Sequence, residues 1–130
     1  MTYTALVLDG ESRAKLLDYF HKVVPLAWER VCHHMTINLG DADAGPAAHL
    51  VGQEFEVTVV TMAQDKRVFA AGVESECPSK NTRKHITYAV NVAGGGKAKH
   101  SNDLTEWVPV IEPLTLRGVV TVVGSTGSHS

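Results

Sequence analysis

The sequence predicts a single α+β domain in which strands outnumber helices, and three observations carry this prediction. The chain has 130 residues, a length that suits one compact domain. Hydrophobic residues make up 44% of it, which is close to the average for globular proteins. One segment has apolar residues at helical spacing, whereas several others are short apolar runs of the kind that form strands. We expect residues 1–124 to form the domain and residues 125–130 to be a flexible tail.

Each element follows from a local pattern. Residues 4–8 predict a first strand that Asp9-Gly10 ends, and residues 12–24 predict a helix that Pro25 stops. Further apolar runs predict strands at 32–39, 54–62, 68–73, 85–92 and 114–123. A hairpin should join the strands at 54–62 and 68–73 around Gln64-Asp65-Lys66. Polar composition predicts loops at 41–50 and 94–103, with room for a second helix near Trp107.

Charge and cysteine content narrow the class of protein. The formal net charge of -2 argues against a protein that coats long nucleic acid, while a small phosphate-bearing ligand remains compatible. The apolar run at 4–8 is too short for a signal peptide, and no stretch reaches transmembrane length. Cys32 and Cys77 form no C-x-x-C pair, so we expect reduced thiols, with a disulfide left open. These features predict a cytoplasmic protein of a cell or of a virus within one, and no membrane partner.

The short motif His-x-Thr occurs twice in strand-like surroundings, at His34–Thr36 and at His85–Thr87. Because successive side chains of a strand point to opposite faces, each His shares a face with its Thr, about 7 Å along the strand. The seven histidines and eleven threonines of the chain give roughly 0.6 such matches by chance, and two copies arise in about one comparable sequence in ten. The alternative interpretation is a pair of structural histidines.

The four motif side chains suit the cleavage of a phosphodiester. Histidine titrates near neutral pH, so two histidines can act as base and acid. Threonine hydroxyls can donate hydrogen bonds to the non-bridging phosphate oxygens, on which charge builds up in the transition state. We therefore predict that His34, Thr36, His85 and Thr87 are the catalytic residues, with no metal and no cofactor.

The two segments that carry the motifs, residues 31–37 and 84–90, resemble the 2H phosphoesterase superfamily. Its members include 2′-5′ RNA ligase-like proteins, cyclic phosphodiesterases of RNA repair, and phage enzymes that destroy cyclic oligonucleotide signals. The resemblance implies a two-lobed fold, in which antiparallel sheets face a central cleft and each contributes one motif. It also implies a phosphodiester substrate with a ribose 2′-oxygen: a 2′,3′-cyclic phosphate end of RNA, a 2′-5′ linkage or a cyclic oligonucleotide.

A basic stretch surrounds the second motif, since no acidic residue lies between Glu76 and Asp103. We expect Lys84 and Lys97 to bind substrate there, although a run of charge is also typical of a solvated face. The run Gly94-Gly95-Gly96-Lys97 is either a flexible turn or a flap whose N–H groups approach phosphate. Trp107 either stacks on a base or belongs to the core.

Two other classes of function remain as alternatives. One is a nucleotide- or RNA-binding module of the same fold without catalysis, which would not need an acid–base pair. The other is a metal-binding protein that uses His33, His34 and His85. It is disfavoured because neighbouring residues of a strand face opposite sides, so His33 should face with Met35, away from His34. The expected partner is a nucleotide or a short RNA. The sequence does not determine the oligomeric state, the particular phosphodiester, or which histidine is the acid.

Overall fold

The computed structural model describes residues 2–39, 50–77, 79 and 83–124. It confirms the α+β class, with strands β1 (Thr2–Leu8), β2 (Glu29–Arg30), β3 (His34–Leu39), β4 (Glu54–Gln64), β5 (Val68–Glu74), β6 (His85–Val90) and β7 (Val108–Gly124). The helices are α1 (Gly10–Phe20) and the short 3₁₀ helices η3 (Val92–Gly94) and η4 (Ala98–Asp103). The predicted tail at 125–130 and the predicted loop at 41–50, apart from Leu50, lie outside the described residues.

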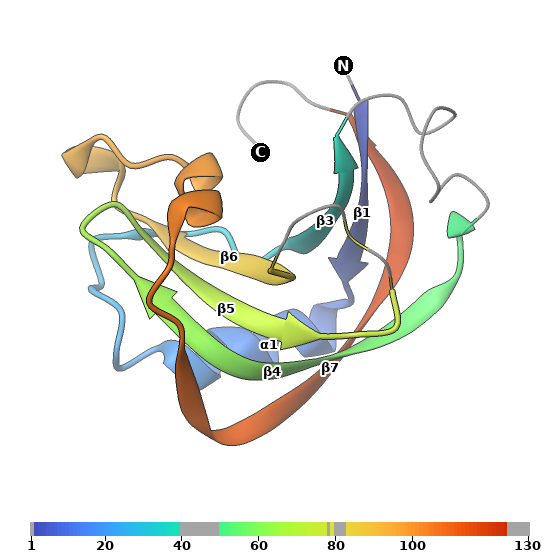
Figure 1. Cartoon of the computed structure of the whole chain (residues 1–130), viewed down its shortest axis with the longest axis horizontal. Helices are drawn as coiled ribbons and strands as arrows, with labels where there is room; N and C mark the ends of the chain where they lie inside the picture. The colour runs from blue at the N-terminus through green and yellow to red at the C-terminus, as the bar shows by residue number, and fades with distance from the viewer. Residues whose placement is uncertain (1, 40–49, 78, 80–82, 125–130) are drawn as a thin grey trace.

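All described strands belong to one antiparallel sheet, in the order β2-β6-β3-β1-β7-β4-β5. Because β5 also pairs with β6, six of the strands close into a ring. Figure 1 shows β4 and β7 curving together along one side of this ring. The two separate sheets that we expected are therefore not formed. The long strand β7 is the reason, since residues 118–124 pair with β1 and residues 108–119 pair with β4, which joins the two halves.

Helix α1 begins and ends earlier than predicted. The carboxylate of Asp9 accepts a hydrogen bond from the backbone N–H of Ser12 at 2.7 Å, which caps the first turn. The helix ends at Phe20 rather than at Val24, and residues 21–23 form turns before Pro25. Val24 nevertheless remains buried, so its apolar character reflects the core rather than the helix.

The hairpin between β4 and β5 follows the predicted pattern, whereas strand β7 departs from it. The hairpin between β4 and β5 is confirmed, with Asp65 donating its backbone N–H to the carbonyl oxygen of Val68 at 3.0 Å. Strand β7 begins six residues before the predicted residue, Leu114. Its ladder with β4 passes from Leu114 opposite Val59 to Pro109 opposite Thr61, so residues 110–113 oppose a single residue. This bulge breaks the alternation of apolar residues on which the prediction depended.

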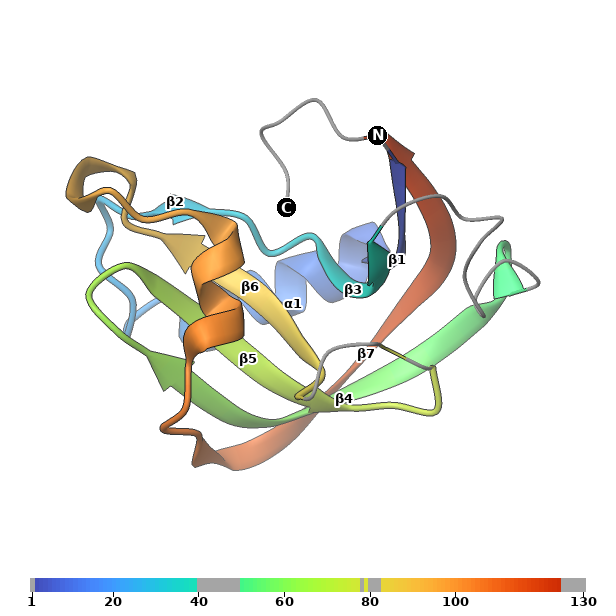
Figure 2. The same cartoon turned by 45° about the horizontal axis from the view of Figure 1, so that its top comes forward.

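The predicted loop at 94–103 contains ordered helical turns. Helix η3 precedes Gly95, whose φ of 83° ends it in the left-handed region that glycine tolerates. Helix η4 then contacts both β5 and β6 and lies across them (Figure 2). Trp107 itself is not helical and sits in the extended segment between η4 and β7. The chain beyond β6 therefore returns to cover the strand that carries the second motif.

The core fixes which face of the sheet is available for chemistry. Met35 and Ile37 of β3 and Ile86 and Tyr88 of β6 are buried in the same apolar cluster as the inner side of α1. The hydroxyl of Tyr88 donates to the carbonyl oxygen of Leu17 at 2.6 Å, which ties β6 to the helix. Alternation then directs the motif residues of β3 and β6 to the other side of these strands, although Ala89 further along β6 joins the cluster. None of the helices in the described part of the chain is long and apolar enough to cross a membrane.

Candidate active site

The two His-x-Thr segments lie on directly paired strands. Met35 of β3 is opposite Ile86 of β6 in an antiparallel register, and both side chains are buried in the core. Thr36 and His85 follow this pair on one side, and His34 and Thr87 follow it on the other, although there the backbone N–H of Cys32 is the group that bonds to the carbonyl oxygen of Thr87. Because side chains alternate along a strand, these four residues share the face opposite the core. The structure thus places the four motif residues on two paired strands, next to the Met35–Ile86 pair.

Small residues surround this face on the neighbouring strands. On β5, Ala70 lies opposite Thr87 and Gly72 lies opposite His85. On β1, Ala5 lies opposite Thr36. His34 and His85 are nonetheless only 6% and 7% exposed, so the histidine rings are largely shielded from water. A shielded site strengthens hydrogen bonds and charge interactions with any ligand that enters it.

The hydrogen bond of His85 defines its tautomer. Its Nδ1 lies 2.8 Å from the carbonyl oxygen of Arg83, and a carbonyl can only accept, so Nδ1 carries a proton. In the neutral ring, Nε2 then holds a lone pair. Burial lowers the pKa of His85, and the hydrogen bond to Arg83 opposes this only in part. The environment therefore favours the neutral, basic form of this histidine.

His34 lies next to a second histidine because the chain bulges just before β3. The backbone N–H of Cys32 donates to the carbonyl oxygen of Thr87 at 3.0 Å, while Met35 is opposite Ile86. Cys32 therefore bonds to Thr87, and Met35 is opposite the neighbouring residue Ile86. His33 and His34 lie between Cys32 and Met35 in the chain, and they form the bulge. The backbone of Cys32 turns there with a φ of 43°, which is uncommon for a residue with a side chain.

The predicted separation of the two neighbouring histidines is wrong. Strand β3 begins at His34 rather than at Cys32, so the alternation of faces does not extend to His33. The Nδ1 atoms of His33 and His34 are 3.0 Å apart, and the two rings meet edge to face with centroids separated by 5.2 Å. His33 therefore belongs to the site, through its contact with a motif histidine.

Helix η4 reaches the second motif through Ser101, which is only 2% exposed. The hydroxyl of Ser101 donates to the carbonyl oxygen of Ala98 at 2.6 Å. Its oxygen is also 2.7 Å from the hydroxyl oxygen of Thr87. Since the Ser101 proton is directed to Ala98, Thr87 is the donor in the second hydrogen bond. Sequence reasoning missed Ser101 because nothing in the local pattern relates it to a threonine on another element.

Trp107 and Arg83 lie beside His85. The centroids of the Trp107 ring and the His85 imidazole are 6.1 Å apart, and the Arg83 guanidinium carbon lies 5.5 Å from the centroid of the indole. Gly72 permits this arrangement, because a Cβ atom there would come within 3.0 Å of the indole ring. Trp107 is half-buried, so it both packs against the sheet and borders the site. Arg83 is thus a cation of the basic stretch that lies near the second motif, through its contact with Trp107.

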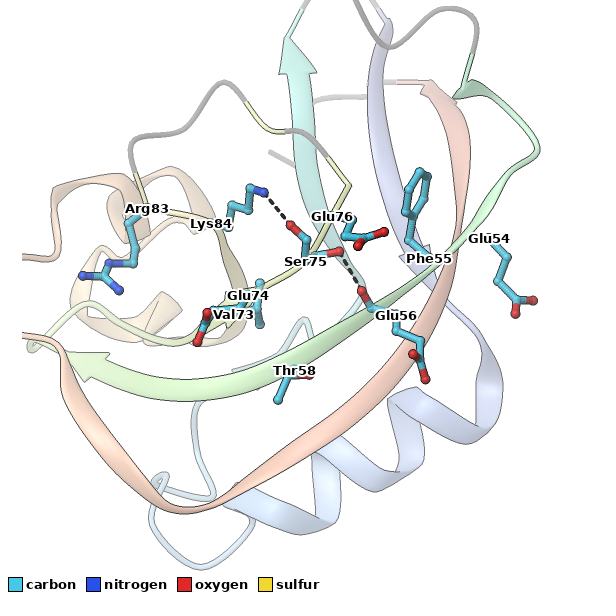
Figure 3. Close-up of a pocket in the computed structure, with 10 residues that line it drawn as sticks. All are labelled: Glu54, Phe55, Glu56, Thr58, Val73, Glu74, Ser75, Glu76, Arg83 and Lys84. Atoms are coloured by element: carbon cyan, nitrogen blue, oxygen red, sulfur yellow. Dashed lines mark hydrogen bonds between the residues drawn. The ribbon is translucent and has the colours of Figure 1, made fainter.

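The two predicted substrate-binding lysines are placed differently. The ammonium of Lys84 donates to the carbonyl oxygen of Ser75 at 2.7 Å, as Figure 3 shows. It lines an open pocket of about 1030 Å³ that also contains Glu54, Glu56, Glu74 and Glu76. Four carboxylates make this pocket, which Arg83 also lines, unfavourable for phosphate, and the Lys84 ammonium is directed to Ser75. Lys97 is exposed at the start of η4, where its backbone N–H donates to His100 Nδ1 at 3.1 Å.

Two further properties concern possible metal and thiol chemistry. Within the described ranges, no three His, Cys, Asp or Glu side chains are grouped so that they could hold a metal ion. Cys32 and Cys77 are buried thiols and form no disulfide with each other. Burial raises the pKa of Cys32 to about 12 and that of Cys77 to about 11, so neither is a nucleophile near neutral pH.

A comparison of this chain with known protein families finds no match, and neither does a comparison with curated proteins.

Proposed function

We propose that this protein is a phosphodiesterase that uses His34 and His85 as an acid–base pair without a metal ion. One observation carries the proposal: β3 and β6 pair directly with Met35 opposite Ile86, so that both His-x-Thr segments present their polar residues on one face. A pair of structural histidines would not require a threonine two residues after each of them. Membership of the 2H phosphoesterase superfamily is proposed on the two motifs, while a single closed sheet stands in place of the two facing sheets that the resemblance implies.

The substrate class follows from the groups around the motif. Two threonine hydroxyls can bind the non-bridging oxygens of one phosphate, and the histidines can act on its two ester oxygens. Arg83 and Trp107 add a cation and an aromatic surface beside His85, which suits a nucleotide with a second phosphate or a base. The net charge of -2 and the four glutamates of the neighbouring pocket disfavour a long RNA. We therefore propose a short substrate with a phosphodiester at a ribose 2′-oxygen.

A substrate panel tests this proposal. The purified protein would be incubated with 2′,3′-cyclic mononucleotides, cyclic di- and trinucleotides, a 2′-5′-linked oligonucleotide and an RNA that ends in a 2′,3′-cyclic phosphate, and the products would be read by mass spectrometry. We expect turnover of at least one of them in excess EDTA. His34→Ala and His85→Ala should each lower the rate about 10²–10⁴-fold, as is usual for loss of a general acid or base. His21→Ala, at an exposed histidine outside the site, is the matched control.

The same experiment distinguishes the alternatives. Binding of a nucleotide without turnover would favour a non-catalytic binding module and contradict the proposal. Activity that EDTA abolishes and a divalent ion restores would contradict the metal-free mechanism. Full activity in folded His34→Ala or His85→Ala, with the fold checked by circular dichroism, would exclude the acid–base pair.

A further inference from the structure

We propose that Thr61 is a substrate-binding residue whose hydroxyl donates a hydrogen bond to the phosphate of the substrate. This inference rests on the proposed phosphodiesterase function and adds a third hydroxyl to those of the two motifs. Thr61 lies on β4, outside both motifs, and its hydroxyl oxygen is buried without a hydrogen-bond partner among the described residues. Two observations carry the proposal: this buried hydroxyl, and its place beside His85.

The strand register places Thr61 on the face of the sheet that carries His85. Thr61 lies opposite Gly72 of β5, and Gly72 lies opposite His85 of β6. Residues directly opposite each other in an antiparallel pair point to the same face. The three residues therefore form a row across three neighbouring strands. Because the middle residue has no side chain, it leaves space over β5 that other side chains can enter.

The hydroxyl of Thr61 enters this space. A Cβ atom on Gly72 would overlap the Oγ1 atom of Thr61, so this oxygen lies where a side chain of residue 72 would begin. Directly opposite residues have Cβ atoms about 4.5–5.5 Å apart, which places the oxygen roughly 5 Å from the Cβ atom of His85. The Nδ1 atom of His85 bonds to a backbone carbonyl, which leaves its Nε2 for another group. One phosphate group can then contact both side chains.

The indole of Trp107 covers the hydroxyl. Its Cε3 and Cζ3 atoms lie 3.0 and 3.1 Å from the position that a Cβ atom on Gly72 would take. The indole N–H donates to the carbonyl oxygen of Leu104 at 3.2 Å, so it does not bond to Thr61. Residues 104–107 belong to no helix or strand, and an outward shift of the indole therefore breaks no strand pairing. Such a shift admits a phosphate oxygen to Thr61.

A further donor suits the chemistry of the site. The proton of Thr87 is already directed to Ser101, whereas the proton of Thr61 has no acceptor within the part of the chain that the structure describes. The Thr61 hydroxyl can therefore donate to a non-bridging phosphate oxygen without giving up another hydrogen bond. This bond strengthens as negative charge builds up on that oxygen in the transition state.

Thr4 provides a matched control, because it has the same buried hydroxyl without the same surroundings. Its hydroxyl oxygen is also buried and without a partner among the described residues. Alternation along β1 places Thr4 on the face of Leu6, whose side chain lies in the core. A buried hydroxyl without a partner lowers the stability of a fold wherever it lies. Only at Thr61, however, does such a hydroxyl share a face with His85.

Substitution of each threonine by valine, which has nearly the same shape, separates binding from structure. Thr61→Val and Thr4→Val should both unfold at a higher urea concentration, measured by circular dichroism, because each removes an unpaired hydroxyl. Calorimetric titration with adenosine 2′-monophosphate and adenosine 3′-monophosphate measures phosphate binding, and adenosine is the probe without phosphate. Thr61→Val alone should weaken binding of the monophosphates about ten- to hundredfold, as for a hydrogen bond to a charged group. Affinity for adenosine should not change, and Thr61→Ser should bind like the unaltered protein.

Several outcomes would overturn the role of Thr61. Equal binding of the monophosphates by Thr61→Val and by the unaltered protein is one, and an equal loss of affinity for adenosine is another. A lower urea midpoint in Thr61→Val would show that the hydroxyl has a partner within the protein and would also overturn it. Turnover of a phosphodiester at the same rate in Thr61→Val would do so while the proposed function stands. Weaker monophosphate binding in Thr61→Val, in a protein that turns over no phosphodiester, would contradict that function and support Thr61 as a phosphate-binding residue.

Discussion

Thr87 is a motif residue whose hydroxyl proton already has a defined acceptor. It donates to Ser101, whose own proton is directed to the carbonyl oxygen of Ala98. A phosphate oxygen requires a donor, so Thr87 can serve it only if Ser101 turns its proton from Ala98 towards Thr87. The 2.7 Å separation of the two hydroxyl oxygens allows either of them to be the donor. We therefore expect the direction of the Ser101 proton to decide whether Thr87 can donate to a phosphate.

Substitution of Ser101 tests this role. Ser101→Ala removes the group that can donate to Thr87, and we expect kcat/KM to fall about three- to tenfold, as for the loss of one hydrogen bond. Thr87→Ala should lower it further, because the phosphate donor itself is lost. In the double variant the loss should equal that of Thr87→Ala alone, since Ser101 acts only through Thr87. Independent, multiplicative losses in the double variant would show that Ser101 has another role.

At the scale of elements, the contact between β5 and the segment after η4 positions the aromatic side of the site. Gly72 lies opposite His85 and faces the indole of Trp107. A Cβ atom at this position would also meet the hydroxyl of Thr61, so the glycine is required by close packing rather than by its backbone angles. The position of Trp107 beside His85 thus depends on the absence of a side chain at Gly72.

Gly72→Ala should therefore displace Trp107 and weaken substrate binding. We expect a higher KM with a smaller change in kcat, and a loss of about 1–3 kcal/mol in the free energy of unfolding, typical of overpacking. Fluorescence in a Trp28→Phe background would report on Trp107 alone. Gly10→Ala is the matched control, because a Cβ atom there meets nothing within 4 Å. An unchanged spectrum and KM in Gly72→Ala would show that Trp107 does not depend on this contact.

The elements that sequence predicted well are those that local residues determine. The strand at 4–8, the hairpin at Asp65 and the faces of both motifs follow from alternation and turn chemistry within a few residues. The position of His33 was predicted wrongly because alternation fails at a bulge, and no glycine marks the left-handed residue Cys32. The joining of the sheet by β7, and the contacts of Ser101 and Arg83, depend on distant segments and have no local pattern.

At the scale of the whole molecule, the buried thiols report on opening of the closed sheet. Cys32 and Cys77 are fully buried, and burial raises the pKa of these thiols to about 12 and about 11. At pH 8 both should resist iodoacetamide for as long as the fold is intact, and both should react in denaturing urea, where the thiol pKa returns to about 8.5. Mass spectrometry of the alkylated protein measures this. Rapid modification of either thiol in the native protein would contradict the burial described here.

The central claim is that the two His-x-Thr strands form one site in which His34 and His85 act together. The most direct test is to compare kcat/KM for His34→Ala, His85→Ala and the double variant on whichever phosphodiester the protein turns over. Residues that act as one unit give strongly non-additive losses. We predict that each single variant loses about 10²–10⁴-fold and that the double variant is no slower than the slower single one. A double variant whose loss is the product of two independent losses, or a single variant with full activity, would contradict the account.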